Sequence, residues 1–310
     1  MTMQRSLRDA LEDYLRLRRA LGFKLQNAGR LLGQFVDYLE ARGIDTITTD
    51  EALTWASLPD NASTHWRAIR LSVVRGFATY LHGSDRSVEV PPPGLFRSGP
   101  CRATPYLYSS AEVASLLEQA TGLHPRLRAA TYQGLIGLLA VSGIRIGEGI
   151  ALDDQDLDVE HAVLAVRDSK FGKSRLVPLH QTTTAALLRY RELRDELSPQ
   201  RSSLALFVSS RGTRLHHSNI GLTFARLTSR SGIVARSASC RPRIHDLRHA
   251  FAVSCLLQCH LSGGDVAVML PRLATYLGHA DPKHTFWYLS AAPELMALAG
   301  QRLEAHLTST

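Results

Sequence analysis

The sequence has few cysteines and no long apolar run, and each shortage excludes a class of protein. Cysteine accounts for 4 of 310 residues at irregular spacing, which excludes a disulfide scaffold and fits a reduced cytosol. The most apolar stretch, residues 134–150, contains Arg145 and Glu148 and is too short and too charged to span a bilayer. No continuous apolar segment typical of a targeting signal follows Met1. We therefore expect a cytoplasmic protein.

Metal-ligand clusters are also scarce. Cys255 and Cys259 stand four residues apart beside His260, but no second cluster supplies the remaining ligands of a zinc site. The pair is more typical of a buried helix face, because free cysteine is usually buried. We also find no carboxylate motif typical of metal-dependent phosphoryl transfer. The sequence therefore predicts neither a metal nor another cofactor.

The overall composition is that of a globular protein with an excess of basic residues. Hydrophobic residues make up 45% and charged residues 21%, which excludes a mostly disordered chain. Lys and Arg number 36 against 28 Asp and Glu, a formal net charge of +8. Such an excess favours a polyanionic partner, most commonly nucleic acid. It also fits a basic soluble enzyme, so the charge alone does not decide.

Proline and glycine concentrate at one place in the chain. Residues 83–105 hold five prolines and three glycines, a composition that excludes a helix or a central strand. We interpret residues 85–105 as a linker between an N-terminal domain, residues 1–84, and a C-terminal domain, residues 106–310.

The N-terminal domain is expected to be all-helical. Apolar residues recur at helical spacing from Leu7 and again from Leu31, and Gly22 and Gly43 are expected to end these two helices. Asp50 is expected to cap a short third helix.

A fourth helix is expected over residues 62–81, with an apolar face that includes Trp66 and Phe77. Arg67, Arg70 and Arg75 lie off this expected face. They either contact DNA phosphates or form an ordinary solvated surface.

The C-terminal domain has a mixed pattern. Ser109 and Glu112 form a capping-box pair ahead of a helix. Short β-prone runs are joined by a glycine-bearing loop and predict a hairpin. A break or a new start is expected at Pro271. The remaining expected elements are an apolar, buried helix over 126–141, strands over 163–167, 176–179 and 204–208, and helices over 218–229, 245–259 and 265–277.

Five motifs in this domain carry side chains suited to phosphate chemistry, although each has an ordinary explanation. Arg145 in SGIRIGE either pairs with Glu148 or binds an anion. His245 and Arg248 in HDLRH share a helix face because they are three residues apart. The other motifs are the cationic hairpin tip KFGKSR, the LGH ending in His279, and a tyrosine nine residues further on, Tyr288.

Taken together and in this order, the motifs resemble the active-site set of the tyrosine recombinases, the phage integrase family. The resemblance covers residues 106–290, and the N-terminal part is similar in helical character to the SAM-like core-binding domain of these enzymes. It implies a protein that is mainly α with a small β-sheet, in which a helical core-binding domain precedes an α+β catalytic domain. The implied catalytic residues are Arg145, Lys170, His245, Arg248, His279 and the nucleophile Tyr288. Lys173 competes with Lys170 for the role of catalytic lysine.

The resemblance also implies an activity. Tyr288 would form a 3′-phosphotyrosyl bond to double-stranded DNA, and two strand exchanges would pass through a Holliday junction, without a cofactor. A tetramer on two DNA sites, with or without sister recombinases, would integrate, excise or transpose a mobile element. A C-terminal helix over 293–307 would dock on a neighbouring subunit or on its own domain. DNA contacts are expected from Arg67, Arg70, Lys173 and Arg175.

Two other functions remain open at this stage. One is a type IB topoisomerase-like enzyme that relaxes DNA as a monomer. The other is a DNA-binding assembly subunit that does not cut.

Overall fold

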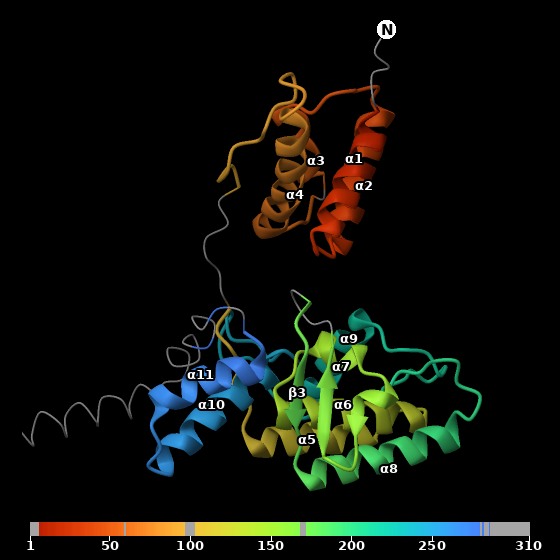
Figure 1. Ribbon diagram of the computed structural model, residues 1–310, viewed down its shortest axis with the longest axis vertical. Helices are drawn as coiled ribbons and strands as arrows, with labels where there is room; N and C mark the ends of the chain where they lie inside the picture. Colours follow the sequence, from red (N-terminus) through yellow and green to blue (C-terminus); the bar gives the residue numbers. More distant parts are fainter. Residues whose placement is uncertain are drawn as a thin grey trace, which may run out of the picture. The chain divides into compact units, whose positions relative to one another are not determined.

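The chain divides into two compact units, Met1–Arg102 and Ala103–Thr310 (Figure 1). The computed structural model describes residues 6–58, 60–96, 103–167, 172–279, 281 and 285. No helix in these ranges is long and apolar enough to cross a membrane.

The described part of the first unit is helical, as expected. Gly22 and Gly43 follow the first two helices with φ of +87° and +67°, a conformation that favours glycine. The third helix is capped by Thr48 and not by Asp50, because the Thr48 hydroxyl accepts the Glu51 N–H at 3.2 Å. The helices are α1 Leu7–Ala20, α2 Gln26–Ala41, α3 Thr49–Ser57 and α4 Thr64–His82.

The interpretation of Arg70 as a residue off the apolar face of α4 is wrong. Arg70 is 7% exposed, and its Nη2 donates to the carbonyl of Trp55 at 2.7 Å. Its guanidinium carbon also lies 3.6 Å from the centroid of the Trp55 ring. Periodicity excluded Arg70 from the core, but the indole face and the carbonyl provide partners that allow a cation to be buried there.

The interpretation of residues 85–105 as a linker is wrong over its first half. Val88 is 3% exposed and belongs to the core of the first unit. Arg75 donates to two proline carbonyls of this segment, at 2.6 and 2.9 Å. Residues 85–96 therefore extend the first unit, while residues 97–102 lie outside the described residues.

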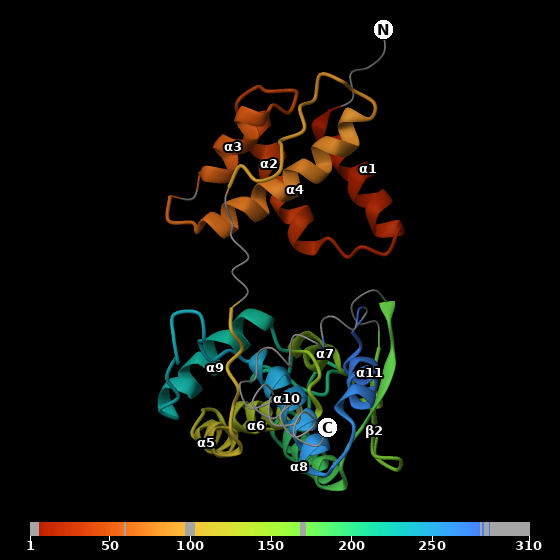
Figure 2. The ribbon, with the colours of Figure 1, turned by 90° about the vertical axis from the view of Figure 1, so that its left-hand side faces the viewer.

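The second unit is built around the long apolar helix α6, Arg126–Ser142, which packs against α5, α8 and α10. The capping box of Ser109 and Glu112 opens α5, as expected. Figure 2 shows these helices beside the small sheet. The other helices are α5 Ser110–Thr121, α7 Ile146–Ala151, α8 Gln181–Leu197, α9 His217–Arg230, α10 Asp246–Leu261 and α11 Val266–Leu277, with the short 3-10 helix η1 Asp154–Asp156.

The sheet is antiparallel, with strands in the order β1 Leu157–Asp158, β2 Val163–Val166 and β3 Arg175–Pro178. The expected hairpin is therefore confirmed, and the fold is mainly α with a small β-sheet. Residues 168–171 of its connection lie outside the described residues. The expected strand over residues 204–208 is wrong, since this run forms only isolated bridges. Residues 205–208 are apolar because they are buried in the core, whereas Leu204 is 74% exposed.

Three α-helices depart from expectation, since α7 had no predicted counterpart either. α11 continues through Pro271, which is exposed, as is Ala267 one turn earlier. Water can therefore satisfy the carbonyl that the missing proline N–H leaves without a donor. α8 was not expected, because it opens with three consecutive threonines, which are poor helix formers.

Candidate active site

Arg145 lies in the tight connection between α6 and α7. Gly143 ends α6 with φ of +59°, and Arg145 occupies the N-cap of α7 two residues later. A Cβ at Gly143 would lie 2.4 Å from Cδ1 of Phe251 on α10. Only glycine fits this turn, and the turn sets the direction in which Arg145 leaves the backbone.

Arg248 projects from the first turns of α10 and is 2% exposed. Its Nη1 donates to the Gly143 carbonyl at 2.8 Å, and its Nη2 donates to the Leu277 carbonyl at 2.7 Å. The guanidinium is therefore fixed between the end of α6 and the end of α11.

Three arginines meet three consecutive carbonyls at the C-terminus of α11. Arg175 Nε donates to the carbonyl of residue 276 at 2.8 Å, and Arg145 Nη2 donates to that of Gly278 at 3.1 Å. Arg248 Nη2 donates to the carbonyl of Leu277, which lies between these two residues in the sequence. The last carbonyls of a helix lack intrahelical donors and lie at the negative end of its dipole, so they attract cations. We call Arg145, Arg175 and Arg248 the arginine centre.

Glu148 joins two arginines of this centre. Its side chain accepts from Arg145 Nη1 at 2.8 Å and from Arg175 at 3.1 and 2.9 Å, and it also accepts the Arg145 backbone N–H at 2.8 Å. Burial alone would raise the pKa of Glu148, but the hydrogen bonds and charges of the two arginines outweigh it and lower the pKa to about 2. The carboxylate is therefore ionised throughout the physiological range, and the ion pair considered from the sequence is present.

His279 is bound on both sides of its ring. Nε2 faces Arg248 Nη2 at 2.9 Å, and Nδ1 lies 2.7 Å from the Thr285 hydroxyl. An arginine can only donate, so Nε2 accepts and Nδ1 carries the proton. In this arrangement His279 orients Arg248.

His245 immediately precedes α10 and shares its first turn with Arg248. Loss of hydration against the surrounding protein lowers its pKa, and the positive charge of Arg248 lowers it further. The imidazole is therefore neutral at neutral pH and able to accept a proton.

The structure thus associates Arg145, His245, Arg248 and His279 within one region of the second unit. Tyr288 and Lys170 lie outside the described residues, as does the C-terminal segment 293–307.

The residues expected to contact DNA have diverse environments. Arg175 is directed inward, with 13% of its side chain exposed, so its expected role as a DNA contact is wrong in this arrangement. Lys173 is exposed just before β3. Arg67 is half-buried, and its Nη2 donates to the carbonyl of Asp60 at 3.2 Å.

Within the described part of the second unit, the cysteine pair on α10 belongs to no cluster of metal ligands. Cys255 and Cys259 are both partly buried, and burial raises the pKa of the Cys255 thiol. Among the residues that the structure describes, no group of three or more His, Cys, Asp or Glu side chains is arranged to hold a metal ion.

Comparison with known proteins points to one family. Residues 108–294 match the model of the phage integrase family. The chain is 43% identical to the putative integrase/recombinase y4rB of Sinorhizobium fredii, over 96% of this chain and 97% of the relative. It is 29% identical to the tyrosine recombinase XerD of Brucella abortus, over 95% and 96% of the two chains. The integrase of transposon Tn1549, solved in complex with transposon right end DNA, shares the fold at 18% identity with a TM-score of 0.60, over 95% and 99%.

The family match and the relatives assign the chain to a class of enzymes that break and rejoin DNA. The chain belongs to the phage integrase family, the tyrosine recombinases.

Proposed function

We propose that this protein performs site-specific recombination through a 3′-phosphotyrosyl intermediate on Tyr288, with two strand exchanges that pass through a Holliday junction. The observation that carries the proposal is the fixation of Arg145 and Arg248 on adjacent carbonyls at the end of α11. Two guanidiniums held side by side match the non-bridging oxygens of one phosphodiester.

The arginines address the main obstacle of the reaction. A phosphodiester carries a negative charge that repels a nucleophile, and this charge grows in the transition state. Preorganised donors aimed at such a charge contribute about 3–4 kcal/mol each. Arg145 and Arg248 are already oriented by protein contacts, so little reorganisation accompanies substrate binding.

The remaining groups accept and donate the protons that the reaction transfers. The phenol oxygen of Tyr288 attacks phosphorus, and neutral His245 accepts the phenol proton. The bond from phosphorus to the 5′ oxygen breaks, and Lys170 protonates that oxygen. Lys173 is the alternative donor, because both lysines belong to the same hairpin connection. The 5′ hydroxyl of a second duplex then attacks the phosphotyrosine and releases Tyr288.

We further propose that the reaction integrates, excises or transposes a mobile element, carried out in the cytoplasm by a tetramer on two DNA sites. The proposed action on a mobile element is supported by the 43% identity to a putative integrase/recombinase. It is also supported by the fold shared with an integrase bound to transposon DNA. Arg67 and Lys173 remain proposed DNA contacts. Arg70 and Arg175 are no longer proposed as DNA contacts: Arg70 is buried against Trp55 of α3, and Arg175 is directed toward Glu148 and the end of α11, where it supports the arginine centre.

The test uses a duplex enriched from a random-sequence library by binding to the full chain and then nicked to trap the covalent product. The wild-type chain should form a denaturation-resistant protein–DNA adduct, and Tyr288→Phe should form none. Arg145→Gln should slow adduct formation by at least about 100-fold. Arg189→Gln, an exposed change on α8, is the matched control and should leave the rate unchanged.

Three outcomes would contradict the proposal. An adduct formed by the Tyr288→Phe variant would show that Tyr288 is not the nucleophile. Relaxation of any supercoiled plasmid without a second site would favour the topoisomerase-like function. Sequence-specific binding without any adduct would favour the non-cutting subunit.

A further inference from the structure

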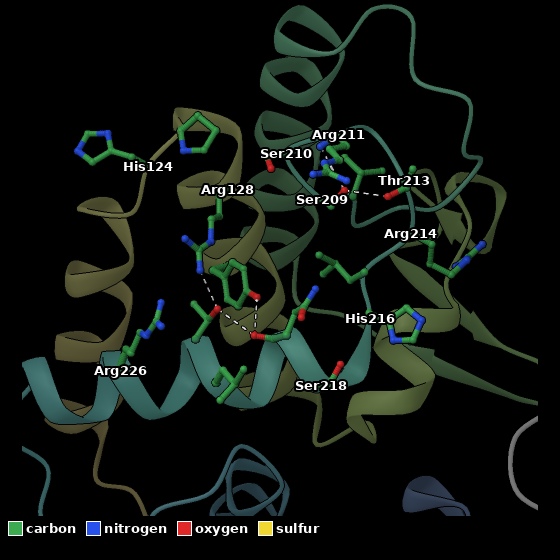
Figure 3. Close-up of a pocket in the computed structure, with 17 residues that line it drawn as sticks. His124, Arg128, Ser209, Ser210, Arg211, Thr213, Arg214, His216, Ser218 and Arg226 are labelled. Carbon is green, nitrogen blue, oxygen red and sulfur yellow. Dashed lines mark hydrogen bonds between the residues drawn. The ribbon is translucent and has the colours of Figure 1, made fainter. Parts of the chain in front are cut away.

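A polar cavity of about 670 Å³ opens between the start of α6, helix α9 and the turn of residues 209–214 (Figure 3). Its lining contains no Asp or Glu among the described residues. The basic residues of the lining are His124, Arg128, Arg211, Arg214, Arg226 and His216. A concave surface with four guanidiniums and no carboxylate favours an anion.

Two of the four arginines are engaged by the protein. Arg214 points away from the cavity, donates to the Ile150 carbonyl at 2.7 Å and pairs with Asp153 (Figure 3). Arg128 Nη2 donates to the Thr223 hydroxyl at 2.9 Å. The Arg128 contact joins α6 to α9 across the cavity, whereas the Arg214 partners lie outside the lining, so the other two arginines define the charge of the cavity.

Arg211 and Arg226 are exposed on two sides of the cavity. Within the described ranges, no hydrogen bond or ion pair involves either guanidinium. Among the described residues no protein group neutralises their charges, so an anion in the cavity would meet two available guanidiniums.

The turn that carries Arg211 is fixed by its own hydrogen bonds. The Ser209 N–H donates to the Thr213 carbonyl at 2.7 Å, and the Gly212 N–H donates to the Ser209 carbonyl at 3.0 Å. Gly212 has φ of +72°, and a Cβ there would lie 2.9 Å from the Ser198 hydroxyl. A side chain on a turn that is already fixed loses less conformational entropy on binding than one on a flexible loop.

The start of α9 adds further donors on the opposite wall. Ser218 and Asn219 lie in the first turn of this 14-residue helix and line the cavity. The Asn219 N–H itself is bound by the His216 carbonyl at 3.1 Å, but the positive end of the dipole at a helix N-terminus still favours an anion with several oxygens. Guanidiniums, hydroxyls and the positive end of the helix dipole together match the chemistry of a phosphate.

We propose that this cavity binds a backbone phosphate of the DNA duplex other than the phosphate that is cleaved, with Arg211 and Arg226 as the main contacts. The proposal rests on the proposed function and adds a second anchoring point to it. α6 separates Arg128 at the cavity from the turn that holds Arg145, and its 17 residues span about 25 Å. That distance corresponds to about 7 base pairs along a duplex at 3.4 Å per pair.

The arrangement of the second unit agrees with this assignment. α7 and α9 are in contact, and both lie at the edge where the β2–β3 hairpin ends, in the two views of Figures 1 and 2. A duplex along this edge would reach the arginine centre and the cavity together. α8 lies at the opposite edge in both views.

The experiment compares Arg211→Gln, Arg226→Gln and the double variant with the control Arg189→Gln on α8. Affinity is measured by fluorescence anisotropy over a range of salt concentrations, with the selected duplex in two lengths. One extends about 12 base pairs beyond the cleavage position and the other about 4, on either side of the 7 expected from the helix length.

On the long duplex, each single substitution should weaken binding by about tenfold. The double variant should reduce the salt slope by about 0.9, because it no longer neutralises one DNA phosphate. On the short duplex, all variants should match the wild type. Arg189→Gln should match the wild type on both.

Equal losses on both lengths, or no loss on the long duplex, would overturn the proposal. Inorganic phosphate is tested separately by its effect on the melting temperature. If phosphate stabilises the wild type but not the double variant, while the two bind DNA with equal affinity, the cavity binds a free anion. That result would overturn the DNA contact. Binding and its salt slope are measured without cleavage. A chain that binds the long duplex as expected but forms no adduct on Tyr288 would therefore contradict the proposed function alone.

Discussion

Glu148 is a single carboxylate that orients two arginines from different elements. Arg145 precedes α7 and Arg175 belongs to β3, and each donates to Glu148 as well as to a carbonyl at the end of α11. Removing the carboxylate would leave two buried or half-buried guanidiniums without their anionic partner. Glu148 is therefore a positioning residue for the proposed chemistry.

Glu148→Gln should lower the free energy of unfolding by about 3 kcal/mol at pH 7 and slow adduct formation. The pKa of Glu148 is lowered from its ordinary value of 4.5 to about 2 in the folded chain. Its stabilisation is therefore complete above pH 4.5 and is lost as the pH falls toward 2. Urea unfolding between pH 7 and pH 3 should show the gap between variant and wild type closing as the pH decreases. A gap independent of pH would contradict this, and exposed Glu160→Gln is the control.

His245 sets the acid limit of the reaction if it accepts the phenol proton. Its pKa is lowered by lost hydration and by Arg248, so the neutral form persists below the ordinary value of 6.5. The single-turnover rate of adduct formation should therefore have an acidic midpoint below pH 6.5. His245→Gln should lower the rate and abolish this midpoint. A wild-type midpoint at or above pH 6.5 would contradict the assignment.

At the scale of single residues, the sequence predicted which residue types the site contains better than it predicted which groups those residues contact. The pair of Arg145 and Glu148 was one of two alternatives that the sequence left open, and it could be considered because the two residues are three apart. The role of Arg175 was missed, because its partners lie 27 and 101 residues away and no local pattern connects them. Arg70 was misplaced for a similar reason, since the indole that covers it belongs to another helix.

At the scale of elements, the turn between α6 and α7 depends on Gly143. Gly143→Ala should place a methyl group against the Phe251 ring in a conformation that disfavours L side chains. Because the turn carries Arg145 and its carbonyl binds Arg248, adduct formation should fall by about 100-fold, together with the melting temperature.

Gly147→Ala is the matched control for this substitution. It lies within α7, and a Cβ there would meet nothing within 4 Å. The rate should be unchanged and the stability unchanged or slightly raised, because alanine favours helix over glycine. Equal losses at both positions would show that the Gly143 turn has no special role.

The elements themselves were largely predictable where periodicity or capping was strong. The hairpin and α5 followed from their local sequence. The strand expected over 204–208 failed, because a short buried apolar run does not distinguish strand pairing from burial alone. α11 continued through Pro271 because the affected turn is exposed to water, which local propensity does not reveal.

At the scale of the whole molecule, the first unit ends later than its composition suggests. Val88 fills a core position contributed by a proline-rich segment, and Arg75 binds that segment by two carbonyls. Proline and glycine content identified a non-helical stretch, but it could not show that half of the stretch packs against helices.

A fragment of residues 1–96 should therefore be more stable than a fragment of residues 1–84. Burial of Val88 alone contributes about 1.5–3 kcal/mol, so the urea midpoint of the shorter fragment should be clearly lower. Val88→Ala in the longer fragment should give part of the same loss. Identical midpoints for the two fragments would mean that residues 85–96 add nothing to the unit.

The acceptors that align the three arginines are main-chain oxygens, and this has an evolutionary consequence. No substitution at Tyr276 or Leu277 can delete a carbonyl, so a change of side chain there does not remove the hydrogen bonds that orient the arginines. Gly278 is different, because its φ of +67° ends the helix and a Cβ would come within 3.1 Å of Arg175. Divergent relatives should therefore vary in the last turn of α11 only among side chains that still fill the core, since Leu277 is 0% exposed, and should retain the glycine that follows it.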